Sequence, residues 1–122
     1  MHPSIGLVLQ LASLVVSTAA GAVSPQGVTG EKPFAHTVRP RQIAEECVQL
    51  AAGQSIAYAF ETSAPVDFNI HFHKGDDVVY PVQRDQVQRG DERFTAASAG
   101  DYCLMWTNTT LQMVTVKGRL AP

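Results

Sequence analysis

Two histidines in a short alternating stretch are the residues best suited to hold a metal ion. His71 and His73 lie two positions apart in the segment 66–73 (VDFNIHFH), where apolar and polar residues alternate. This period is typical of a β-strand, and it places both imidazoles on one face. Because imidazole nitrogen binds zinc and copper, we predict a candidate site for one of these metals, with Asp67 or His36 as a third ligand.

The same strand face can instead be a polar surface that is solvated or that contacts another molecule. Asn69 lies between Asp67 and His71 on this face, and Asp76 and Asp77 follow in the next turn. Two histidines are fewer ligands than a zinc site needs. The alternative to a metal site is therefore a binding surface with Asn69, Asp76 and Asp77 as its candidate residues.

Cys47 and Cys103 are the two cysteines of the sequence. Neither a pair of C-x-x-C motifs nor a Cys/His zinc spacing is present. In an exported protein such a pair is typical of a disulfide bond, and the alternative is two separate buried thiols. Because the intervening loop is long, the chain-entropy model gives the bond a contribution of roughly 4 kcal/mol to stability. We expect a structural staple and not an active site.

No catalytic motif is present in the sequence. It contains no G-x-S-x-G, no phosphate-binding loop and no H-E-x-x-H. Its carboxylates cluster in expected turns and loops, and an oxidised Cys103 is a poor nucleophile. The formal net charge is −2 and no basic block occurs, so nucleic acid is not an expected partner. We expect a protein that is not an enzyme.

The N-terminus predicts export. An apolar run at 5–16 is too short to cross a bilayer, and small residues follow it up to Ala22. We predict a signal peptide at 1–22, cleaved after Ala22, and a mature chain that is periplasmic or extracellular without a stable membrane span. An uncleaved anchor is the alternative, because the first residues contain neither lysine nor arginine.

The mature chain divides into two parts by composition. Proline and glycine recur every few positions at 23–42, which predicts a flexible leader. Short apolar-polar runs between turn residues at 43–122 predict an all-β domain, an antiparallel β-sandwich of about seven strands with one disulfide. The expected strands are 47–50, 55–61, 66–73, 78–82, 93–97, 102–107 and 111–120. The expected turn is 62–65, and 83–92 is expected to be a solvated polar loop or hairpin.

Three finer expectations concern single elements. The segment 42–50 could be helical instead, because it shows a faint helical period. Pro81 cannot donate a ladder hydrogen bond, so its strand is expected at a sheet edge. Gly75 is expected to take a positive φ in the turn after His73.

Aromatic residues are expected in the core and not on a binding face. Tyr58, Tyr102 and Trp106 alternate with the strand pattern, and Tyr102 lies where sandwich tyrosines hydrogen-bond the backbone. Asn108 begins an N-glycosylation sequon, which has meaning only in a eukaryotic source.

These features together resemble the GOLD (Golgi-dynamics) domain, in the form of a bacterial-type secreted relative. The resemblance covers about 46–120. It rests on the cysteine at the domain start, the run 66–70 and the segment 100–108 (GDYCLMWTN). Eukaryotic members continue into a coiled coil and a transmembrane helix, whereas this sequence ends at Pro122, so we do not carry over a role in vesicle traffic. The resemblance implies a β-sandwich that contacts protein or lipid.

The sequence therefore leads to two hypotheses of different classes. The first is an exported, non-catalytic interaction module that contacts a protein, lipid or glycan and needs no cofactor. The second is a periplasmic metal-binding protein that holds zinc or copper at His71 and His73.

Overall fold

Six antiparallel strands make up the part of the chain that the computed structural model describes, residues 30–122. They are β1 (Lys32–Val38), β2 (Ile43–Leu50), β3 (Ser55–Lys74), β4 (Asp77–Thr95), β5 (Gly100–Thr107) and β6 (Val114–Ala121). The all-β, antiparallel prediction is confirmed, with six strands in place of about seven. The predicted signal peptide and its cleavage after Ala22 lie outside the described residues.

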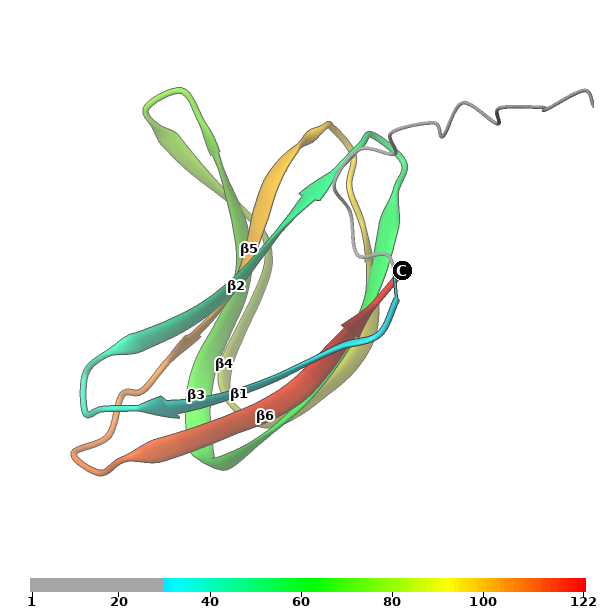
Figure 1. Cartoon of the computed structure of the whole chain (residues 1–122). Coiled ribbons are helices and arrows are strands. Elements are labelled where there is room, and N and C mark those ends of the chain that lie inside the picture. Colours follow the sequence, from blue (N-terminus) through cyan, green and yellow to red (C-terminus); the bar gives the residue numbers. More distant parts are fainter. Residues whose placement is uncertain (1–29) are drawn as a thin grey trace, which may run out of the picture.

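The long strand β3 belongs to two layers (Figure 1). Its first half, 57–62, pairs with β6, and its second half, 67–71, pairs with β5. The order β1-β6-β3-β5-β2 therefore folds at the middle of β3, and β4 runs along the other side of β3 in both layers. One layer carries β1 and β6, and the other carries β2 and β5.

The predicted turn at 62–65 bends β3 without ending it. The pairing of β3 with β4 shifts register between Glu61 and Val66, and the Thr62 hydroxyl donates a hydrogen bond to the Ala64 carbonyl. Beyond this irregularity β3 leaves β6 and joins β5. The turn-forming residues therefore mark the corner between the layers, and the two strands predicted at 55–61 and 66–73 are one.

The polar stretch 83–92, expected as a solvated loop or hairpin, is a continuous part of strand β4. Within residues 30–122, β4 pairs with β3 alone, so one of its edges faces solvent and its side chains are mostly exposed. An exposed edge strand has no apolar alternation to reveal it. The prediction that the strand containing Pro81 lies at an edge is confirmed.

Of the predicted flexible leader, residues 23–29 lie outside the described range, and most of the rest is a strand. β1 pairs with β6 over Lys32–Val38 and buries Phe34 and Val38. With only two buried side chains in a proline-containing segment, the apolar alternation was too short to predict this strand. The segment after the next turn is a strand from Ile43 onward, so the helical alternative for 42–50 is wrong as well. No helix that could cross a membrane occurs in the described range.

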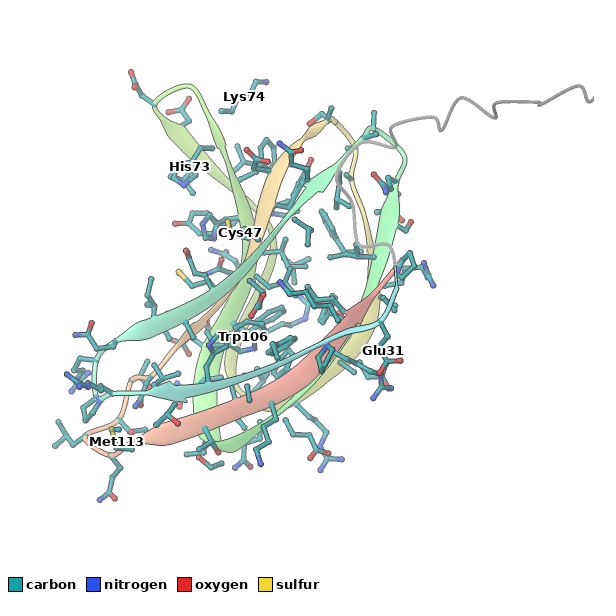
Figure 2. The ribbon with its side chains drawn as sticks, in the orientation of Figure 1. Glu31, Cys47, His73, Lys74, Trp106 and Met113 are labelled. Carbon is teal, nitrogen blue, oxygen red and sulfur yellow. A yellow bond between two sulfur atoms is a disulfide. The ribbon has the colours of Figure 1, made fainter. Side chains whose placement is uncertain are left out.

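Aromatic rings fill the space between the two layers, as predicted (Figure 2). Trp106 is fully buried and lies 5.0–5.5 Å, centroid to centroid, from the rings of Phe34, Phe60 and Phe68. Tyr58 and Tyr102 are buried too. The Tyr102 hydroxyl donates a 2.6 Å hydrogen bond to the Ser98 carbonyl, which confirms the expected backbone contact.

Asn108 fastens the β5–β6 connection to the rest of the fold. Its amide nitrogen donates to the carbonyls of Val38 and Gln112, at 3.0 and 2.6 Å. Its amide oxygen accepts from the backbone and hydroxyl of Thr110. The side chain is fully buried, so in the folded protein the sequon nitrogen is occupied by structure and is not displayed to solvent.

Candidate functional site

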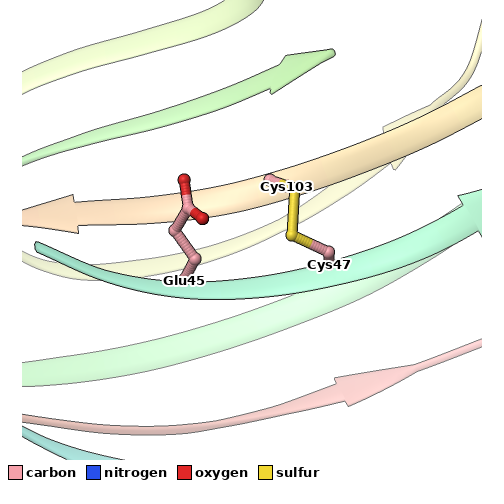
Figure 3. Close-up of side chains that lie close together, drawn as sticks. All are labelled: Glu45, Cys47 and Cys103. Atoms are coloured by element: carbon pink, nitrogen blue, oxygen red, sulfur yellow. A yellow bond between two sulfur atoms is a disulfide. The ribbon is translucent and has the colours of Figure 1, made fainter. Parts of the chain in front are cut away.

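The predicted disulfide is present between Cys47 and Cys103, with an S–S distance of 2.04 Å (Figure 3). The two residues are direct partners in the pairing of β2 with β5, which runs over eight positions. Cys47 is exposed and Cys103 half-buried, so the bond lies on the outer face of its layer and not in the core. The alternative of two separate buried thiols is wrong.

The outer face around this bond carries side chains from four strands. We call it the disulfide face. It carries Glu45 and Cys47 of β2, Cys103 of β5, Asn69, His71 and His73 of β3, and Val78 and Tyr80 of β4. The alternation predicted for 66–73 is correct, because Val66, Phe68 and Ile70 are buried in the core on the opposite face.

His71 is the buried member of this face and is only 6% exposed. Its Nδ1 lies 2.7 Å from the Asn69 side-chain oxygen, and its Nε2 lies 3.6 Å from Oε1 of Glu45. The rings of His73 and Tyr80 are 5.6 and 5.8 Å away. Since the Asn69 oxygen can only accept, Nδ1 carries the proton and Nε2 presents a lone pair toward Glu45.

Burial lowers the pKa of His71 below its usual 6.5. The Glu45 carboxylate opposes this shift by attracting the protonated form, and His73 adds to it. The imidazole is therefore neutral at pH 7, which is the form that binds metals.

The three predicted metal ligands do not converge. His71 and His73 are neighbours, but Asp67 is four residues from His71, roughly 13 Å along the strand. The Asp67 carboxylate accepts hydrogen bonds from the backbone and side chain of Gln86. His36 lies on β1 in the other layer, with its Nε2 2.9 Å from Glu46. Neither Asp67 nor His36 therefore lies where it could be a third ligand. Metal binding by His71 and His73 stays a prediction.

Glu45 is the residue that the sequence analysis missed. Within residues 30–122, the one group of three close metal-donor residues is Glu45, Cys47 and Cys103, whose donor atoms all lie within 4.8 Å of one another. Glu45 reaches His71 over the intervening strand β5, and this proximity follows from the strand order. No local pattern around position 45 signals it.

The end of the β3–β4 hairpin extends past the rest of its layer (Figure 1). Pairing of β3 with β5 ends at His71, whereas pairing with β4 continues to Lys74 and Asp77. We call residues 72–80 the projecting hairpin. Gly75 turns it with a φ of 62°, as predicted.

The projecting hairpin exposes both apolar and acidic side chains. Val78, Val79 and Tyr80 are 39%, 36% and 45% exposed. Two of the predicted surface residues, Asp76 and Asp77, are exposed at its turn, beside the apolar side chains. The third, Asn69, is half-buried and bonded to His71, so its side chain is a support of the disulfide face.

A shallow groove of about 720 Å³ lies at the other layer. Its walls carry the cations Arg89, Lys117 and Arg119 and the anions Glu31, Glu61, Asp91 and Glu92. Lys117, Glu61 and Arg89 are neighbours in register, so opposite charges alternate across the strands. This balance favours neither an anionic nor a cationic ligand.

Tyr58 and Glu92 form a hydrogen-bonded pair of titratable groups at the core edge. The Tyr58 hydroxyl donates a 2.9 Å hydrogen bond to Glu92. Burial, followed by the Glu92 contact, raises the pKa of Tyr58 far above its usual value. A phenol held so firmly in its protonated form cannot act as a base at neutral pH.

No family model matches the chain, and no curated protein sequence matches it. Three solved structures are similar to it in fold. The Yersinia pseudotuberculosis-derived mitogen is 9% identical, with 75% of this chain and 84% of that chain covered and a TM-score of 0.54. The pre-peptidase C-terminal domain of a Bacillus anthracis collagenase is 10% identical, with 74% and 88% covered and a TM-score of 0.57. Aeromonas hydrophila PliG, a periplasmic inhibitor of g-type lysozyme, is 15% identical, with 75% and 85% covered and a TM-score of 0.55.

At these identities the likeness shows the fold alone. The chain shares the β-sandwich-like architecture of these domains, with a cross-strand disulfide on one outer face. None of the three structures is a GOLD domain, so the GOLD resemblance stays a prediction.

Proposed function

We propose that this chain is an exported, non-catalytic protein-binding module that contacts its partner through the projecting hairpin. The observation that carries the proposal is the exposure of Val78, Val79 and Tyr80 on a hairpin that extends past the strand pairing of its layer. Val78 and Tyr80 lie on one face of β4 and Val79 on the other, so the hairpin presents apolar side chains on both faces. Exposed apolar side chains that lie close together are typical of interaction sites, and tyrosine is enriched at interfaces.

The chemistry of the hairpin favours a protein over a lipid surface. Asp76 and Asp77 lie at the turn, where contact with an anionic membrane would be repulsive, and Lys74 supplies a single positive charge. A paired hairpin also loses little conformational freedom on binding. One fold neighbour is an inhibitor of g-type lysozyme, which supports a protein partner. The GOLD resemblance implies contact with protein or lipid.

Export is supported by the disulfide. A bond between Cys47 and Cys103 persists in oxidising compartments and is rare in the cytosol. This agrees with the signal peptide predicted from the sequence.

A photo-crosslinking amino acid tests the hairpin directly. It is placed at Tyr80, or at Leu111, which is 79% exposed in the β5–β6 connection, and each protein is mixed with extracellular proteins of the source organism. We expect one discrete adduct from position 80 and none from position 111. Val78→Asp in the same protein should reduce that adduct at least tenfold. Equal labelling from both positions, or none from position 80, contradicts the proposal.

A g-type lysozyme is the first defined partner to try, because one fold neighbour inhibits enzymes of this class. Calorimetric binding that Tyr80→Ala weakens and Leu111→Ala leaves intact would name the partner class. Binding that survives Tyr80→Ala would contradict use of the hairpin.

A further inference from the structure

The disulfide face holds a set of metal-donor atoms that the oxidised protein cannot use. The donor atoms of Glu45, Cys47 and Cys103 lie within 4.8 Å of one another, and the Glu45 carboxylate lies beside the disulfide (Figure 3). The His71 imidazole lies outside this close group, with its Nε2 3.6 Å from Oε1 of Glu45. Two sulfurs, one carboxylate and one imidazole are four donors of the kinds that zinc binds. The sulfurs, however, are bonded to each other.

We propose that reduction of the disulfide turns this face into a binding site for a zinc-like divalent ion. The two thiolates, the Glu45 carboxylate and the His71 imidazole are its ligands. The site adjoins the base of the projecting hairpin, where the His71 ring lies 5.8 Å from that of Tyr80, but its ligands lie outside the hairpin and it does not depend on the hairpin's binding role. It also differs from the pair His71 and His73 considered above, because His73 contributes no ligand.

The pairing of β2 with β5 holds the thiols together after reduction. Cys47 and Cys103 are direct partners near the middle of eight paired positions, with Cα atoms 4.0 Å apart. A tetrahedral zinc ion with Zn–S bonds of about 2.3 Å needs its sulfurs about 3.8 Å apart. Rotation about the Cα–Cβ bonds provides this separation without a change in the backbone pairing.

The imidazole is already oriented as a ligand. The hydrogen bond from Nδ1 of His71 to the Asn69 oxygen, 2.7 Å long, fixes the ring and leaves Nε2 facing Glu45. Metal-binding histidines are commonly held by such a bond from the other ring nitrogen. His71 comes from β3, which is paired with the cysteine-bearing strand β5 at His71 and Cys103.

Reduction and metal binding are balanced steps. A dithiol reductant gives two electrons and two protons to the disulfide, the S–S bond breaks to yield two thiols, and the reductant becomes a disulfide. A divalent ion then displaces the two thiol protons and forms two metal–sulfur bonds. Cys47 is exposed, so the reductant can reach it. Oxidation and metal binding therefore exclude each other.

Cadmium is a suitable probe, because cadmium–thiolate bonds absorb in the ultraviolet. The mature chain is reduced with a phosphine, which does not compete as a dithiol would, and titrated with Cd²⁺. We expect this absorption to saturate at one equivalent, and zinc to displace the cadmium. The oxidised protein should bind at least a hundredfold more weakly. Equal affinity of both forms, or no saturable absorption in the reduced form, overturns the proposal.

Variants of Glu45 and His71 distinguish a four-ligand site from metal binding by the two thiols alone. Glu45→Gln and His71→Ala should each weaken cadmium binding at least tenfold, whereas His73→Ala, on the same strand and exposed, should leave it unchanged. Wild-type affinity in both Glu45→Gln and His71→Ala would remove the four-ligand site.

If the reduced protein unfolds when no metal is bound, a zinc titration measures refolding. In that case one equivalent of zinc should restore the β-sheet circular dichroism and raise the melting temperature of the reduced wild type. It should not do so for the protein with both Cys47→Ser and Cys103→Ser. Failure of zinc to restore the fold of the reduced wild type would overturn the proposal.

Discussion

The imidazole of His71 on β3 and the carboxylate of Glu45 on β2 face each other across β5, with 3.6 Å between Nε2 and Oε1. The two residues are 26 positions apart in the sequence. The contact exists because β5 pairs with both β2 and β3 and places their outward side chains over its own. It couples the titration of a buried histidine to a nearby carboxylate.

This buried histidine should make stability depend on pH. Burial holds the pKa of His71 below 6.5 in the folded protein, with Glu45 opposing and His73 adding to the shift. The unfolded chain therefore binds more protons than the folded one as the pH falls through 6.5. The stabilising contribution is complete above this value and is lost as the pH drops toward the lowered pKa of the folded state.

Urea unfolding between pH 8 and 5 measures this effect. We expect the free energy of unfolding of the wild type to fall below pH 6.5, and His71→Gln to remove part of that decline. His73→Gln is the matched control, because it removes one imidazole from the same strand. An equal flattening in both variants would show that His71 is not the group responsible.

Removing the disulfide should be costly although its strands are already paired. The bond closes a loop of 56 residues in the unfolded chain, which the chain-entropy model values at about 4 kcal/mol. We expect the protein with Cys47→Ser and Cys103→Ser to lose about 3–4 kcal/mol in urea unfolding. A loss below about 1 kcal/mol would mean that the unfolded chain is already compact around these residues.

Gly118 is a position where a single methyl group should disrupt the fold. It is the partner of Phe60 in the pairing of β3 with β6, and a Cβ there would collide with the Ala59 carbonyl oxygen and the Phe34 ring. Because a backbone atom cannot yield as a side chain can, we expect Gly118→Ala to cost about 3 kcal/mol or more. Gly30→Ala, with nothing within 4 Å, is the control and should change stability little.

The part of the fold that local sequence patterns predict is the part with strict alternation. The run 66–73 predicted both the strand and the face that His71 and His73 share, because one face is buried and the other is not. The cysteine pair predicted a bond without any knowledge of the register. Both inferences need only neighbours in sequence or a pair of unique residues.

The parts that failed depend on partners distant in sequence. β1 forms because it pairs with β6 along its whole length. The sequence around Phe34 has too few apolar residues to predict a strand by itself. The segment 62–65 has turn-forming residues, yet it does not end the strand. It is a bend within β3, because β3 pairs with β4 on both sides of it. Glu45 became a candidate ligand through the strand order, which no single segment encodes.

The side chain of Asn108 should matter to stability. One of its four hydrogen bonds reaches β1 at the Val38 carbonyl, and the other three lie within the β5–β6 connection. Asn108→Ala leaves the buried Val38 carbonyl without this donor and the Gln112 carbonyl with the Thr110 hydroxyl as its donor, so we expect a loss of about 2–4 kcal/mol. Gln112→Ala is the control, since the bonds at Gln112 use its backbone and its side chain is exposed. Equal losses in both variants would contradict a role for the buried amide.

The projecting hairpin should open on its own, without unfolding of the layers. Beyond His71, strand β3 has β4 as its one paired neighbour in the described chain, whereas at Ile70 it is paired with both β4 and β5. Segments with few flanking contacts exchange their amide hydrogens through local opening, and central strands do so through global unfolding. We therefore expect amides at 72–80 to exchange at least a hundredfold faster than those of Ile70 and Leu104.

Binding of a partner at Val78 and Tyr80 should slow exchange in the hairpin and leave the central strands unchanged. If the hairpin is as protected as Leu104 in the free protein, it does not open on its own, and contacts that the strand pairing does not include hold it in place.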